Sequence, residues 1–71
     1  MSAPYHAVLS KLDQSETYAN EVTAALTDDE AKAKAYQWAW TECGKRGIAK
    51  ALLILTGGTI KRSHSEVIDL S

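Results

Sequence analysis

The residue types that carry chemistry are few in this sequence, and only one short run gathers several of them. Ser63, His64 and Ser65, followed by Asp69, are the residue types of a Ser-His-Asp hydrolase. Neighbouring residues of a strand point to opposite faces, however, and no oxyanion-hole or nucleophile-elbow motif accompanies this run. We therefore expect no catalytic residue there, and we expect that the protein is not an enzyme.

The remaining metal-ligating and nucleophilic side chains do not form a recognisable site either. The chain has one cysteine, Cys43, and two histidines, His6 and His64, without the paired spacings that zinc sites use. Cys43 lies near the end of a predicted helix, where the helix dipole disfavours a thiolate, so we expect it to be a buried small apolar residue. We predict no metal site and no cofactor.

Basic residues gather in the second half of the chain and acidic residues in the first. Residues 1–30 carry six acidic side chains against one lysine, whereas residues 31–64 carry seven basic side chains against one glutamate. The basic set could contact nucleic acid, although a pI near 6.0 argues against a strong polyanion binder. The acidic set could instead meet a basic protein surface. Thr56-Gly57-Gly58-Thr59 lacks the Lys-Ser/Thr of a phosphate-binding loop and indicates a hairpin turn.

Length and composition predict one small domain over residues 1–71, with residues 1–4 as a loose N-terminal end. At 71 residues the core is expected to be thin, and a single cysteine excludes an internal disulfide framework. No leader with a charged and then an apolar region is present, and the longest apolar run, residues 51–55, is too short to span a bilayer. These features predict a cytoplasmic protein without a membrane partner.

One helix is clearly marked in the residues. Thr27 followed by Glu30 is a capping box, and residues 28–30 place negative charge at the positive end of the helix dipole. Gly44 can take the left-handed conformation that ends a helix, which predicts a helix from about Asp28 to Cys43. On a helical wheel Ala35, Ala39 and Cys43 form a small-residue seam that should face a sheet. Tyr36 and Trp40 flank this seam on one edge and Trp38 on the other, so one tryptophan should be partly exposed.

The segments on either side of this helix favour strands. Residues 5–12 and 17–26 fit either helical or strand spacing, and their β-branched and aromatic residues favour strands joined by a turn at residues 13–16. Residues 48–56 read as a strand that enters a two-residue turn at Gly57-Gly58 and pairs with the strand that follows. Pairing Thr56 with Thr59 would set Ala51 opposite His64. The strand of residues 48–56 is apolar on both faces, and one helix covers only one side, so the other side is a candidate surface for a partner or a second copy.

The predicted fold is therefore a small α+β domain of order ββαββ, an antiparallel sheet with one helix packed on one face. The alternative is a mostly α-helical small domain, in which residues 4–12 and 14–26 are helices. The order of elements, with Ala24 to Ala31 joining the second strand to the capped helix, resembles small phage-encoded proteins such as anti-CRISPR proteins and other inhibitors of host enzymes. The resemblance is one of architecture. It implies a class of function and no functional residue.

We predict a non-catalytic module that binds another protein or protein complex, of the kind that a phage or mobile element uses as an inhibitor, and that forms a homodimer. The alternative is a small nucleic-acid-binding protein that uses the basic second half. The predicted partner-binding residues combine the two tryptophans with the basic side chains: Trp38, Trp40, Lys50, Lys61, Arg62 and His64.

Overall fold

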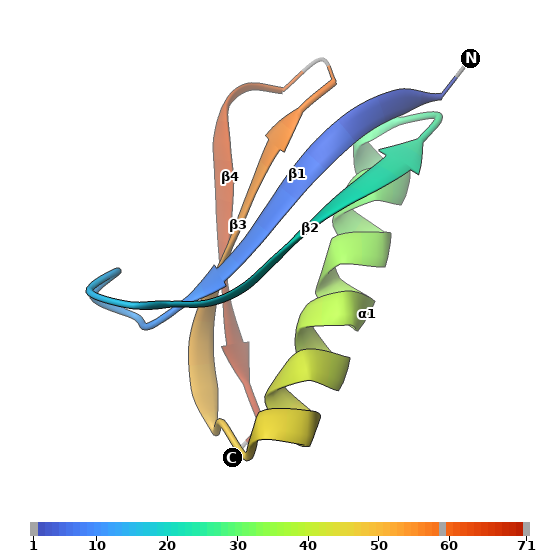
Figure 1. Cartoon of the computed structure of the whole chain (residues 1–71). Helices are drawn as coiled ribbons and strands as arrows, with labels where there is room; N and C mark the ends of the chain where they lie inside the picture. Colours follow the sequence, from blue (N-terminus) through green and yellow to red (C-terminus); the bar gives the residue numbers. More distant parts are fainter. Residues whose placement is uncertain (1, 59, 71) are drawn as a thin grey trace.

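The chain folds into a four-stranded sheet with one helix, in the order ββαββ, as a computed structural model shows (Figure 1). The elements are β1 (Ala3–Ser10), β2 (Thr17–Ala25), α1 (Asp28–Arg46), β3 (Lys50–Gly57) and β4 (Ile60–Asp69). The structure describes residues 2–58 and 60–70, and of residues 60–62 it describes the backbone. The α+β prediction is confirmed, and the mostly helical alternative is wrong.

Every neighbouring pair of strands is antiparallel, and the strand order is β2-β1-β3-β4. The central strands β1 and β3 come from the two halves of the chain, and the strands adjacent to them in sequence form the two edges. Helix α1 lies along one face of this sheet (Figure 1). No helix or strand in the described part of the chain covers the other face.

Thr27 begins the helix, as its capping box predicts. Its hydroxyl oxygen accepts the backbone N–H of Glu30 at 3.1 Å, while the Glu30 carboxylate accepts the N–H of Leu26 at 3.2 Å, one residue before the expected donor. The buried Tyr5 hydroxyl donates to the Asp28 carboxylate and so ties the first helical turn to β1. The start of the helix is therefore anchored by its own cap and by the sheet.

The predicted end of the helix is wrong by one turn. Gly44 is helical, and α1 continues to Arg46, where Gly47 takes the left-handed conformation at φ 69°. The N–H of Ile48 donates to the carbonyl of Cys43 at 2.9 Å, which is the hydrogen bond of a Schellman C-cap. Both glycines could end a helix, and the tertiary position of β3 decides between them.

The core lies between α1 and the sheet. Ala31, Ala35, Ala39 and Cys43 form the buried seam of the helix, which confirms the predicted seam and adds one turn to it. The largest fully buried side chains on the sheet side are Leu9, Leu53, Leu55 and Ile68. Because the helix contributes small residues, its backbone can approach the sheet closely.

The register of β3 against β4 differs from the predicted one. Ala51 pairs with Ile68 and Leu55 with His64, so β4 is displaced by four residues from the predicted pairing. An even displacement keeps each side chain on its predicted face, which is why His64 still shares a face with Leu55. The displacement arises because Gly57 already pairs with Ile60 and a bulge adds residues to β4 beyond that point.

The hairpin glycines are required by a close approach of β1. A Cβ on Gly58, whose φ is 53°, would lie 2.2 Å from the Tyr5 ring, so Gly58 packs directly on this ring. The N-terminal end is also more ordered than predicted, since β1 starts at Ala3, which pairs with Ala25. Residues 13–16 form the predicted turn, with Gln14 at φ 61°.

Candidate functional site

The side of the sheet that faces away from α1 carries several apolar side chains that no other described element covers. We call it the open face and define it by the strand positions whose side chains point away from the helix. Its apolar members are Val8, Val22, Leu52, Ile54 and Val67, and its polar members include His6, Asn20, Thr56 and Ser65.

The strand pairings place four of the five apolar members of the open face side by side. Ile54 lies between Val8 of β1 and Ser65 of β4, and Leu52 pairs with Val67. Val22 lies on edge strand β2, opposite His6 and diagonally across from Val8. Val22 and Val67 are 69% and 55% exposed, whereas Leu52 and Ile54 are half-buried by their neighbours in the sheet. The paired cluster therefore covers β1, β3 and β4, and Val22 extends the apolar surface to β2.

Few of the open-face side chains that the structure describes carry a charge. Among these side chains, formal charge is confined to Lys50 and Asp69, which pair with each other at 4.0 Å at one end of the sheet. Residues at the centre of an interface are typically depleted in charge in the same way. The open face has the composition of a surface that excludes water when a partner covers it.

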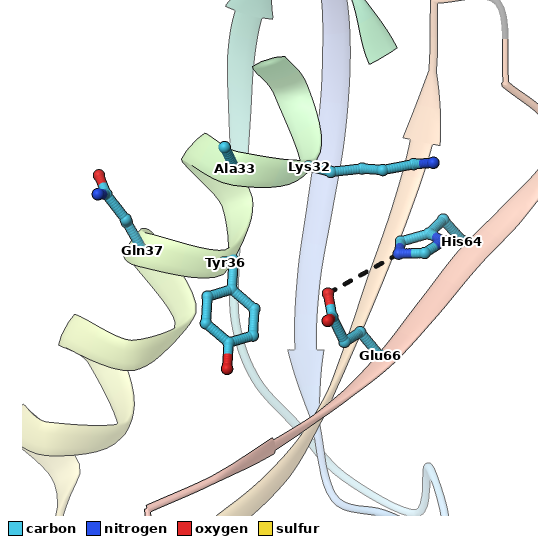
Figure 2. A pocket seen from close by; sticks show the side chains of 6 residues that line it. All are labelled: Lys32, Ala33, Tyr36, Gln37, His64 and Glu66. Carbon is cyan, nitrogen blue, oxygen red and sulfur yellow. Dashed lines mark ion pairs between the residues drawn. The ribbon is translucent and has the colours of Figure 1, made fainter. Parts of the chain in front are cut away.

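A second surface lies between α1 and edge strand β4. Lys32, Ala33, Tyr36 and Gln37 of the helix and His64 and Glu66 of β4 line a groove of about 480 Å³. Figure 2 shows Lys32 extending from α1 toward His64 and Glu66, whose side chains lie within an ion-pair distance of 3.8 Å. Further along the helix, Tyr36 and Trp40 stack obliquely with ring centroids 6.0 Å apart and border a second hollow of about 580 Å³.

No family model, curated protein or solved structure matches this chain.

The predicted partner-binding residues do not form one site. Trp40 is 41% exposed and lies beside the groove, on the same side of the sheet as His64, whereas Trp38 is half-buried against the core on the opposite flank of the seam. Lys50 lies at the far end of the sheet, in its ion pair with Asp69. Lys61 and Arg62 belong to β4, and their side chains lie outside the described part of the structure. The expectation of one exposed tryptophan is confirmed by Trp40.

The residue types of the hydrolase triad are separated by the sheet. His64 points toward the helix, while Ser63, Ser65 and Asp69 occupy alternate positions on the open face. Cys43 is fully buried, as predicted, and this burial, reinforced by the charge of Glu42, raises the pKa of its thiol. Within residues 2–58 and 60–70, no three His, Cys, Asp or Glu side chains come close enough to hold a metal ion. No helix in this part of the chain is both long and apolar enough to cross a membrane.

Sequence reasoning identified the uncovered side of the sheet but missed two of its main residues as binding candidates. Val22 and Val67 lie on the edge strands, and a single valine in a strand sequence does not by itself indicate a binding residue. The available signal was the alternation Asn20, Val22, Ala24, whose apolar members point away from α1.

Proposed function

We propose that this chain is a non-catalytic module that binds another protein molecule through the open face of its sheet. The observation that carries this proposal is the exposure of Val22 and Val67 at the two edges of a cluster that Val8, Leu52 and Ile54 continue across the centre. An antiparallel sheet covered on one side normally alternates apolar residues toward the core with polar residues toward water. Strand β3 departs from this rule, and the departure is explained if a partner covers the open face.

The proposal agrees with the separation of the reactive side chains. A catalytic site needs a nucleophile, a base and an orienting group within hydrogen-bond reach of one another. In this chain the serines and the histidine of the triad-like run point to opposite sides of the sheet, and the thiol is buried. A protein that acts by occupying a surface of its partner needs none of these groups. Inhibitors of host complexes from phages, which the architecture resembles, would act in this manner.

Nucleic-acid binding through the basic second half stays a prediction and has less support. Lys50 pairs with Asp69 and Arg46 with Glu42 at 3.5 Å. A nucleic-acid surface needs several cations whose charge is directed to phosphates, since their electrostatic attraction supplies most of the affinity. Among the open-face side chains that the structure describes there is one ammonium, that of Lys50, and it is already paired with Asp69.

Photo-cross-linking tests the proposal directly. A photoreactive amino acid replaces Val22 on the open face or, in a matched chain, Thr41 on the exposed side of α1, and both chains are irradiated in the cells that produce the protein. We expect a protein adduct from position 22 and little from position 41. An adduct only from position 41 would move the binding surface to the helix, and equal yields or no adduct from either position would refute the proposal.

A further inference from the structure

We infer that the partner on the open face is a second copy of this chain, which packs sheet against sheet to form a two-fold dimer with the helices outside. This inference rests on the proposed function and names the occupant of the same surface. Its first support is electrostatic. Among the side chains that the structure describes, two copies of the open face bring no like charges together at the centre, because the charge of these side chains is confined to the Lys50–Asp69 pair at one end.

The apolar cluster is also suited to a two-fold contact. A two-fold interface brings the same patch together from both molecules, so each side must be complementary to itself. The apolar side chains of the open face are aliphatic and extend from β2 to β4, so a rotated copy presents aliphatic side chains over most of the cluster. Face-to-face sheets pack about 10 Å apart with their strands turned by about 30°, a separation that side chains of Val, Leu and Ile size fill.

The available area suits a weak dimer. Strands about 4.8 Å apart and a rise of about 3.3 Å per residue give the open face roughly 440 Å² per copy before the relief of side chains is counted. Two copies then bury about 1,000 Å², at the lower limit for a specific interface. The dimer should accordingly be weak, and its population should depend on protein concentration.

The covered side of the sheet gives an independent reason for a second layer of packing. Of the twelve buried hydrophobic residues among those that the structure describes, six are alanine, and a chain of 71 residues buries a smaller share of its surface than a larger domain. The half-buried Leu52 and Ile54 supply aliphatic side chains that the core behind α1 does not use. In the dimer, the second copy buries these two side chains, so no additional domain of the same chain is needed to cover them.

Sedimentation equilibrium of the purified chain over a wide concentration range tests the inference. The wild-type mass should rise from 7.7 kDa toward twice this value. Val22→Glu and Val67→Glu should each weaken the association at least about tenfold, because each buries an unpaired carboxylate in the contact. Thr41→Glu adds the same charge on the exposed side of α1 and should leave the association unchanged. Circular dichroism verifies that each variant is folded, and Val22→Thr replaces Val22→Glu if the latter unfolds.

Several outcomes would overturn the dimer. One is a chain that keeps its 7.7 kDa mass at all concentrations. Another is association that Val22→Glu and Val67→Glu leave intact or that Thr41→Glu weakens equally. Pairing through one sheet edge would respond to only one of the two valine variants, since β2 and β4 form opposite edges. If the chain is monomeric yet position 22 cross-links to a different protein, the dimer fails while the proposed function stands; if neither occurs, both fail.

Discussion

Leu52 and Leu53 are adjacent residues of β3 on opposite faces of the sheet, and truncating each to alanine should give very different losses of stability. Leu53 is 1% exposed beneath α1, whereas Leu52 is half-buried on the open face. Leu→Ala removes about three carbon groups, worth about 2.4 kcal/mol of transfer free energy when fully buried. A residual cavity adds to this cost at Leu53, so Leu53→Ala should lose about 3–4 kcal/mol. Leu52→Ala should lower the free energy of unfolding of the monomer by about 1 kcal/mol, because the half-buried side chain contributes about half of the transfer free energy and its removal leaves no closed cavity.

Urea unfolding followed by circular dichroism measures both losses. A chain of 71 residues has a total stability of about 4–10 kcal/mol, so Leu53→Ala removes a large part of it. With a urea m-value of about 1 kcal/mol/M, the midpoint should fall by about 3 M for Leu53→Ala and by about 1 M for Leu52→Ala. The measurement is made at low protein concentration, where the chain is monomeric. Equal losses for the two variants would refute the assignment of an uncovered face. At high concentration the cost of Leu52→Ala should grow, because the dimer buries this side chain.

Three further predictions concern the core and the start of the helix. Tyr5→Phe should destabilise the chain by about 1.5–3 kcal/mol in thermal or urea unfolding, because it removes a buried hydrogen bond to the Asp28 carboxylate. The Cys43 thiol should react with a disulfide reagent only as fast as the chain unfolds, because it is buried and its raised pKa disfavours the thiolate; rapid reaction in native buffer would contradict its burial. The hydrogen bond from the Leu26 N–H lowers the pKa of Glu30 from 4.5, so its contribution to stability is present above that pH and is lost as the pH falls through the lowered pKa. A pH titration of the unfolding midpoint should show this loss in wild type and a smaller one in Glu30→Gln.

The parts of the fold that the sequence predicts are those governed by local rules. Thr27 and Glu30 mark the start of α1 because their hydrogen bonds involve only neighbouring residues. The alternation of β3 also survives the change in register, since each side chain stays on its face when the pairing moves by an even number of residues.

The parts that sequence reasoning misjudged depend on distant contacts. Whether Gly44 or Gly47 ends the helix is decided by the position at which β3 must enter the sheet, and both residues satisfy the local rule. The pairing of β4 shifts because Gly57 pairs with Ile60 and a bulge follows, next to the point where Gly58 packs on the ring of Tyr5, which is far away in sequence. The predicted binding residues were likewise selected because they are aromatic or basic, which says nothing of where the fold places them. The topology puts Trp38, Trp40 and Lys50 on different sides of the molecule.

The distribution of side-chain size over the two faces of the sheet supports an interface more strongly than exposure alone. On the central strands the covered face presents Leu9, Leu53 and Leu55, and the open face presents Val8, Leu52 and Ile54, so the two faces carry aliphatic side chains of similar bulk. Isolated apolar residues are common on protein surfaces, but a contiguous cluster across a whole sheet is not. On edge strand β4, by contrast, Ser63 and Ser65 point to the open face, as a solvated face requires. The apolar side chains are therefore concentrated on the central strands of the open face and reach the edge strands at Val22 and Val67, among polar neighbours such as Ser63 and Ser65. Interfaces between proteins likewise combine an apolar core with a polar rim.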